Sequence, residues 1–197
     1  MVVFDATMLL TLIHPNIGVT IDSSTGAPVT HPKERIEALV KEFQKAKTKI
    51  GIPTPALGEA LVRIGPRRTQ FVDKLNDMAV FECLPFDQLS AIELAIMTKD
   101  ALDAGNKKGG SSEPWVKVKF DRQIAAIAKV NGATAIYTDD EGLKNTATAN
   151  GFTVLGLADI PIPPESKQIE LQFSSDDQAA LNEIDQINAA EIPTPPE

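Results

Sequence analysis

Five acidic side chains stand at places in the sequence from which they could meet in a folded chain. One ends an apolar run at the N-terminus, one lies in a helical segment, one opens a later helix and two follow a strand; they are Asp5, Glu59, Asp121, Asp139 and Asp140. Clustered carboxylates repel each other and are expensive to bury unpaired, so such a set needs a compensating cation. Carboxylate oxygens are the ligands that Mg²⁺ and Mn²⁺ prefer. A metal held there could bind a phosphodiester oxygen and activate a water, which is chemistry that requires neither His nor Cys.

Each of these carboxylates also has an ordinary structural interpretation. Asp5 and Asp121 could serve as helix N-caps, because Asp is a favoured capping residue. Glu59 could face solvent from its helix, and the run of residues 139–141 could be first-turn charge that the helix dipole favours. The site hypothesis therefore depends on the convergence of several residues and not on any one of them.

The elements that must position these residues follow from the apolar patterning. Strands are expected over residues 2–4, 80–84, 134–137 and 152–155, with a further short extended segment near 52–54. Helices are expected over residues 8–13, 33–51, 56–64, 66–77, 87–104, 120–130 and 141–150. Strands that alternate with helices predict an α/β fold, a three-layer α/β/α sandwich with a central, mainly parallel sheet. In such a sheet ligands gather beyond the C-terminal strand ends, where Asp5, Asp139 and Asp140 would lie.

The net charge of the chain is unevenly distributed. The 27 acidic and 19 basic residues of the 197 give −8, which argues against a nucleic-acid partner if taken for the whole chain. Residues 161–197, however, hold eight acidic residues and one basic residue, and six of the 14 prolines. Residues 1–160 carry only −1, and residues 33–68 carry +5. We therefore expect one domain over residues 1–160, followed by a flexible, acidic, Pro-rich tail over 161–197.

Composition narrows the class of protein further. The hydrophobic fraction of 43% is enough for a core, and the single cysteine, Cys83, excludes both an intramolecular disulfide framework and a cysteine-ligated zinc site. No apolar run approaches the roughly 18 residues that a membrane span needs. These features predict a cytoplasmic protein with no membrane partner.

Three motifs resemble those of PIN-domain ribonucleases, and of VapC-type members in particular. Residues 2–7, VVFDAT, resemble the first motif of the family, an apolar strand that ends in Asp, and residues 53–59, PTPALGE, resemble the second, with a Glu inside a helix. The most specific match is FDRQIAAIA at 120–128, then Gly132-Ala133, then YTDDEGL at 137–143. The resemblance covers about residues 1–158 in the family's order.

The resemblance implies the roles of the site residues. The metal-binding, catalytic carboxylates would be Asp5, Glu59, Asp121 and Asp140, with Asp139 as the alternative to Asp140. Thr7 and Thr138 would support them. The activity implied is Mg²⁺- or Mn²⁺-dependent hydrolysis of single-stranded RNA, and the partners implied are an antitoxin and, as a homodimer, a second copy of the chain. The loop at 15–32 and the acidic tail depart from the compact toxin pattern.

Basic residues near these motifs are candidates for holding the RNA backbone, because phosphates are bound chiefly by Lys and Arg. The candidates are Lys117, Lys119, Arg122, Arg63, Arg67 and Arg68. Each could equally belong to a solvated helix face.

Three alternatives stay open at this point. The chain could be a non-catalytic PIN module that binds RNA or a protein. It could also be a phosphatase of the haloacid dehalogenase type, although that family has a second Asp where this chain has Thr7. The tail could lie over the RNA path as a phosphate mimic, or it could merely solubilise the chain.

Overall fold

The computed structural model describes residues 1–13, 20–22 and 25–163. The chain divides into two units, Met1–Ile162 and Pro163–Glu197. The predicted flexible tail lies, apart from residues 161–163, outside the described residues, as does part of the predicted loop at 15–32. Among the described residues, no helix is both long and apolar enough to cross a bilayer.

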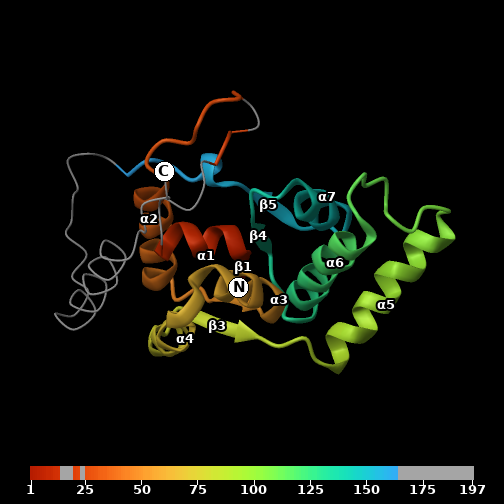
Figure 1. Cartoon of the computed structure of the whole chain (residues 1–197), viewed down its shortest axis with the longest axis horizontal. Coiled ribbons are helices and arrows are strands. Elements are labelled where there is room, and N and C mark those ends of the chain that lie inside the picture. Colours follow the sequence, from red (N-terminus) through yellow and green to blue (C-terminus); the bar gives the residue numbers. More distant parts are fainter. Residues whose placement is uncertain (14–19, 23–24, 164–197) are drawn as a thin grey trace, which may run out of the picture. The chain divides into compact units, whose positions relative to one another are not determined.

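Five short strands form one parallel sheet, as the alternating pattern predicts (Figure 1). The strands are β1 (Val2–Phe4), β2 (Ile50–Pro53), β3 (Phe81–Leu84), β4 (Ala135–Tyr137) and β5 (Thr153–Leu155). Their order across the sheet is β3-β2-β1-β4-β5, and every neighbouring pair is parallel. The strand order therefore reverses between β1 and β4, which lie side by side with Val3 opposite Ile136.

Helices cover both faces of this sheet (Figure 1). They are α1 (Ala6–Ile13), α2 (Pro32–Lys45), α3 (Thr54–Ile64), α4 (Arg68–Asp77), α5 (Gln88–Asp103), α6 (Trp115–Val130) and α7 (Glu141–Ala149), with 3₁₀ turns at Gly65–Arg67 and Leu157–Asp159. Because crossovers between parallel strands are right-handed, α1 to α4 belong to one face and α6 and α7 to the other, where α5 packs against α6. This arrangement confirms the predicted three-layer α/β/α fold.

The core lies where the central strands meet both helical layers. Val3, Phe4, Ile52 and Ile136 are at most 1% exposed, because strands that are covered on both faces bury every side chain. The ring of Tyr137 packs edge-on against Phe4, with 5.4 Å between the ring centroids. The short central strands are thus fixed by packing on both sides, and so are the residues that follow them.

The prediction that the helix beginning at residue 33 extends to Gly51 is wrong. Helix α2 ends at Lys45, and Lys47 adopts a left-handed φ of 54° while the Thr48 amide donates to the Phe43 carbonyl. A residue in this conformation ends a helix by satisfying its last carbonyls. Ile50 is then fully buried in β2, so its apolar character belongs to the sheet and not to the helix.

Helix α6 begins at Trp115, five residues before the predicted start at Phe120. Pro114 occupies the N-cap position, and the Val118 amide donates to its carbonyl. The helix start matters for the site, because it places Asp121 in the second turn of α6, where Lys117 is one turn away.

Candidate functional site

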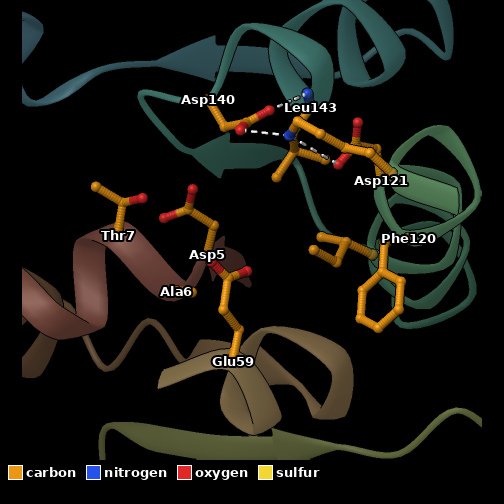
Figure 2. A pocket seen from close by; sticks show the side chains of 10 residues that line it. Asp5, Ala6, Thr7, Glu59, Phe120, Asp121, Asp140 and Leu143 are labelled. Carbon is orange, nitrogen blue, oxygen red and sulfur yellow. Dashed lines mark hydrogen bonds and ion pairs between the residues drawn. The ribbon is translucent and has the colours of Figure 1, made fainter. Parts of the chain in front are cut away.

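The candidate site lies beyond the C-terminal ends of β1 and β4, where the strand order reverses. This is the place at which open parallel sheets bind ligands. Asp5 directly follows β1, and Thr138 and Asp140 follow β4. Figure 2 shows Asp5 and Asp140 on neighbouring loops, with Glu59 of α3 and Asp121 of α6 across the opening.

Asp5 is 4% exposed and is held by two hydrogen bonds. Its Oδ1 accepts from the Met8 amide at 2.9 Å, which caps α1, and its Oδ2 accepts from the hydroxyl of Thr138 at 2.5 Å. Burial raises the pKa of Asp5 from 3.8 to about 7, although both hydrogen bonds oppose the shift. The buried carboxylate thus gains strongly from a nearby positive charge.

Asp140 is the N-cap of α7. Its Oδ1 accepts from the Leu143 amide at 2.9 Å, and its own amide donates to the Thr138 hydroxyl at 3.0 Å. Burial alone would raise its pKa, but the hydrogen bonds from Lys117 and the Leu143 amide hold the pKa below its ordinary value. Thr138, which is fully buried, therefore links the Asp5 and Asp140 loops.

Asp121 reaches the same space from α6 and is 5% exposed. Burial raises its pKa from 3.8 to about 6, while the charge of Lys117 opposes the shift. A Cβ at Gly142 would lie 2.6 Å from Oδ2 of Asp121 and 3.1 Å from Oδ1 of Asp140. Gly142 therefore provides the space in which the two carboxylates approach each other.

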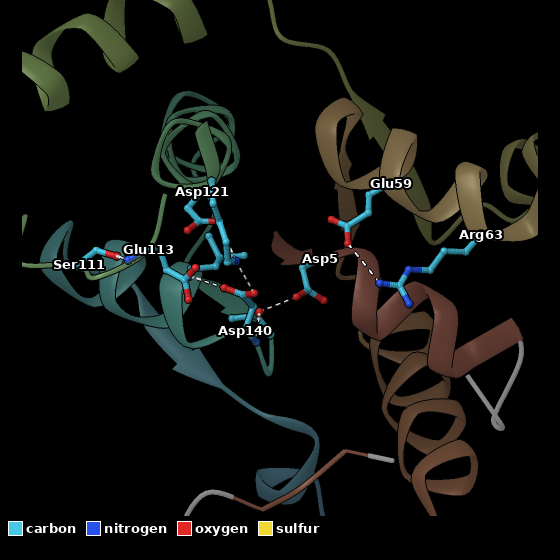
Figure 3. Close-up of polar contacts among 10 residues, drawn as sticks. Asp5, Glu59, Arg63, Ser111, Glu113, Asp121 and Asp140 are labelled. Atoms are coloured by element: carbon cyan, nitrogen blue, oxygen red, sulfur yellow. Dashed lines mark hydrogen bonds and ion pairs between the residues drawn. The ribbon is translucent and has the colours of Figure 1, made fainter. Parts of the chain in front are cut away.

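Glu59 differs from the other three carboxylates because its side chain is 56% exposed. It lies in the second turn of α3, with its Oε1 4.0 Å from the Arg63 guanidinium. Figure 3 shows Glu59 and Arg63 on one side of Asp5, and Asp121 and Asp140 on the other. Glu59 can thus reorient toward a bound ion more freely than Asp5 can.

A cavity of about 370 Å³ joins these side chains. Its lining residues are Asp5, Ala6, Thr7, Glu59, Lys117, Phe120, Asp121, Ile124, Asp140 and Leu143. The structure thus brings together the four predicted catalytic carboxylates and the supporting Thr7, while Thr138 lies directly behind them.

Asp139 is directed away from this cavity. Its Oδ1 accepts from the Leu157 amide at 3.0 Å, and a Cβ at Gly156 would lie 2.6 Å from that oxygen. The adjacent pair of aspartates therefore has two roles: Asp140 lines the cavity, and Asp139 fixes the turn after β5.

The predicted RNA-binding residues fall into three places. Lys119, Arg63 and Arg68 are exposed, and Arg67 is partly buried in the 3₁₀ turn after α3; none of these four lines the cavity. Lys117 lines it and pairs with its carboxylates.

Arg122 does not fit the prediction that it grips RNA from the surface, because it is only 5% exposed. Its guanidinium donates to the Lys107 carbonyl at 2.7 Å and lies 5.5 Å from the centroid of Trp115. The hydrogen bond to Lys107 attaches the preceding loop to α6, and the contact with Trp115 lies within α6 itself. Both contacts are structural.

Within the described residues, no three His, Cys, Asp or Glu side chains are close enough to hold a metal ion jointly. The four carboxylates surround the cavity without forming a closed ligand set. The positive charge of Lys117 occupies part of the space between them.

Two residues that shape this geometry, Gly142 and Lys117, were not predicted in these roles. Gly142 lies inside the quoted motif, but only the three-dimensional approach of Asp121 and Asp140 shows why a side chain is excluded there. The pairing of Lys117 with Asp121 has the i, i+4 spacing of a helix. It would have been visible if α6 had been predicted from Trp115.

Comparison with known proteins gives matches at the level of structure. No family model matches the sequence, and no curated protein matches it. One similar solved structure is that of VapBC2 from Rickettsia felis bound to a DNA fragment from their promoter, with a TM-score of 0.51 and 14% identity over 79% of this chain and 98% of the other. Another is DNA-bound VapBC from Salmonella typhimurium, with a TM-score of 0.50 and 16% identity over 80% and 99% of the two chains.

These similarities concern the fold. They extend over nearly the whole length of the matched chains, so the described domain has the fold of a chain found in VapBC complexes. The predicted resemblance to VapC-type PIN proteins is thereby confirmed for the fold. The chemistry of the cavity has to be argued from this chain's own residues.

Proposed function

We propose that this chain is a metal-dependent endoribonuclease that hydrolyses phosphodiester bonds of single-stranded RNA. The observation that carries the proposal is the cavity at the switch point of the sheet, where Asp5, Glu59, Asp121 and Asp140 face a common space. The fold similarity of this chain to chains of VapBC complexes supports the further proposal that the chain is the toxin of a toxin–antitoxin pair.

The donor set fits Mg²⁺ or Mn²⁺ by its chemistry. All four ligands would be carboxylates, and Mg²⁺ is commonly held by only one or two of them while it keeps several waters. A closed cage of three side chains is therefore unnecessary. The ion would lower the pKa of an attacking water and neutralise charge on the phosphate.

The protein's own groups fix this arrangement before any ligand binds. The Met8 amide and the Thr138 hydroxyl hold both oxygens of Asp5, so its carboxylate cannot rotate freely. Thr7, which lines the cavity, presents a hydroxyl that can hydrogen-bond to a water or a phosphate oxygen. Positioning of this kind contributes to rate because reacting groups need not be ordered during the reaction.

The flanking RNA backbone would lie near basic residues around the cavity. The candidates are the exposed Lys119, Arg63 and Arg68 and the partly buried Arg67, whereas the burial of Arg122 argues against its contact with RNA. An antitoxin partner, a homodimer and a cytoplasmic location belong to the same proposal. Copurification tests the antitoxin, sedimentation tests the homodimer, and cell fractionation tests the location.

The direct test is cleavage of a single-stranded RNA with Mn²⁺, with Mg²⁺, and with EDTA. We expect metal-dependent cleavage by the wild-type protein and none by Asp5→Asn. Asn keeps the shape of the side chain and can still accept the Met8 hydrogen bond. Equal cleavage by the variant, from a preparation free of contaminating nuclease, would refute the site.

One observation favours a second candidate, a non-catalytic RNA- or protein-binding module. Lys117 already offsets part of the negative charge of Asp121 and Asp140, which stabilises the cluster without a metal. A thermal-denaturation titration with Mn²⁺ separates the two functions. A catalytic site predicts stabilisation that Asp5→Asn removes, and a non-catalytic module predicts no stabilisation in either protein.

A further inference from the structure

One basic side chain lies inside the carboxylate cluster instead of on the surface around it. The Nζ of Lys117 is 2.5 Å from Oδ2 of Asp140 and 3.8 Å from Oδ1 of Asp121. Asp121 is on the same helix as Lys117, whereas Asp140 caps α7. A single ammonium thus bridges two helices through two carboxylates of the proposed metal site.

Lys117 carries the one positive charge among the described residues that line the cavity. The two carboxylates beyond its reach have other partners: Asp5 accepts from Thr138 and Met8, and Glu59 lies near the exposed Arg63. The charge balance inside the cavity therefore depends on Lys117. Its side chain is 35% exposed, so the ammonium also has a route to solvent.

An ammonium and a divalent cation cannot both occupy this position. An Mg²⁺ ion bound directly to a carboxylate oxygen lies about 2.0–2.1 Å from it. An ammonium 2.5 Å from Oδ2 of Asp140 would then be in close contact with a like charge, within a partly buried cavity that screens charge poorly. Lysine can move away, because its charge is at the end of a flexible four-carbon stem.

We propose that Lys117 is an exchangeable counter-ion of the site: its ammonium holds Asp121 and Asp140 in the metal-free protein and must leave them when a divalent cation binds. The inference rests on the proposed function, since it takes these carboxylates as metal ligands. The Lys117 ammonium then stabilises the metal-free carboxylate cluster and lowers the affinity of the site for a metal.

The first test compares Mn²⁺ binding to the full-length wild type and to Lys117→Met by isothermal titration calorimetry. Met preserves most of the aliphatic stem and removes the charge. We expect Lys117→Met to bind Mn²⁺ at least about fivefold more tightly. The matched control is Lys119→Met, which removes the same charge from an exposed position of α6 outside the cavity and should leave the affinity within about twofold of wild type.

The outcomes separate this inference from the proposed function. If Mn²⁺ binds the wild type and Asp5→Asn abolishes binding, but Lys117→Met binds no more tightly, the counter-ion role is overturned while the metal site stands. If Mn²⁺ binds neither the wild type nor Lys117→Met, both proposals are overturned. If Lys119→Met tightens binding as much as Lys117→Met, the effect is general electrostatics and the counter-ion role is again overturned.

A second test needs no substitution at Lys117. The wild-type protein is treated briefly with an amine-reactive ester, with and without Mg²⁺, and the modification of Lys117 relative to Lys119 is measured by peptide mass spectrometry. We expect Mg²⁺ to raise the relative modification of Lys117 several-fold, because the released ammonium is more exposed. An unchanged ratio at a Mg²⁺ concentration that saturates binding would overturn the proposal.

Discussion

Among the described carboxylates, Asp5 has the surroundings that most disfavour its charged form. It is 4% exposed and accepts hydrogen bonds from the Met8 amide and the Thr138 hydroxyl, and no described Lys, Arg or His forms an ion pair with it. Asp139 and Asp140 add negative charge nearby. Metal-free protein therefore carries an unfavourable charge at this position whenever Asp5 is ionised.

The first prediction concerns the pH dependence of stability without metal. Because the pKa of Asp5 is about 7 in the folded chain and 3.8 ordinarily, the folded state binds more protons than the unfolded state between these values. The contribution of Asp5 to the free energy of unfolding is then fully present below pH 3.8 and is lost as pH rises through 7. Asp5→Asn, which is always neutral, should be more stable than wild type at pH 8 by about 2–4 kcal/mol in EDTA.

Urea unfolding at pH 5 and pH 8 measures this difference, and Glu59→Gln is its control. Glu59 is more than half exposed, so its neutralisation should shift the free energy of unfolding by less than about 0.5 kcal/mol at either pH. Equal stability of wild type and Asp5→Asn at pH 8 would contradict the burial argument for Asp5.

The two adjacent aspartates illustrate how much of the site is readable from residues alone. The motif spacing favoured Asp140 over Asp139, and only Asp140 lines the cavity. Nothing in the sequence indicated that Asp139 would instead accept from the Leu157 amide, because that contact depends on how the chain returns after β5. Arg122 shows the same limit, because its hydrogen bond to the Lys107 carbonyl depends on the path of the loop before α6, which has no sequence signature.

Among the elements, α6 and α7 set the distance between Asp121 and Asp140. The two helices pack against each other, and Gly142 in the first turn of α7 lies at their contact. The approach of the two carboxylates therefore depends on the absence of a side chain at one position.

The second prediction is that Gly142→Ala damages the site more than the fold. The new Cβ would lie 2.6 Å from Oδ2 of Asp121, so this carboxylate has to move. Displacement of a catalytic group by about 1 Å can lower a rate about 100-fold, and we expect a 10- to 100-fold loss of cleavage. Ala is a better helix former than Gly by about 1 kcal/mol, which offsets part of the strain in the melting temperature.

The control for this substitution is Gly58→Ala in α3. A Cβ at Gly58 meets nothing within 4 Å, although Gly58 is adjacent to Glu59. This variant should cleave like wild type and melt at a slightly higher temperature. If Gly142→Ala also cleaved like wild type, the close approach of Asp121 and Asp140 would be irrelevant to activity.

Element boundaries were predictable where a chemical signal marked them. Asp87 caps α5 through the Ser90 amide at 2.8 Å, and the predicted and observed starts of this helix agree within a residue. The start of α6 was missed because the alternation in residues 115–119 is typical of an extended segment, whereas packing makes them helical. The end of α2 was missed because Lys47, not a glycine, adopts the left-handed conformation.

In the whole molecule, charge is separated along the chain. The net charge is −8, and removal of residues 164–197 would leave −1.

A cut after Asp159 would reach into the fold, since Ile160 is 3% exposed and the Arg35 guanidinium donates to the carbonyls of Ala158 and Ile160. The truncation that preserves the described domain therefore ends at Pro163.

The third prediction concerns this truncation. If the tail only solubilises the chain, the truncated protein should cleave RNA at the wild-type rate, within about twofold, at both 50 mM and 300 mM salt. We expect this result. A rate increase confined to low salt would instead support the tail as a phosphate mimic, because screening weakens such an interaction.

The fold class was predictable because strand and helix patterns alternate along the chain and parallel sheets require crossovers. The meeting of Asp5 with Asp140 followed from the same rule, since both come after strand ends. The ion pair of Lys117 with Asp140, by contrast, joins residues 23 positions apart through packing that no local pattern encodes.

The central claim is that these carboxylates form a metal-dependent ribonuclease site. Its most direct test is the initial rate of cleavage of an end-labelled single-stranded RNA in Mn²⁺, for the wild type and for Asp121→Asn at equal, folded concentration. We expect cleavage that EDTA stops, products with 5′-phosphate ends, and a loss of at least about 100-fold in the variant. A rate in Asp121→Asn equal to that of wild type, or wild-type cleavage that persists in EDTA, would contradict it.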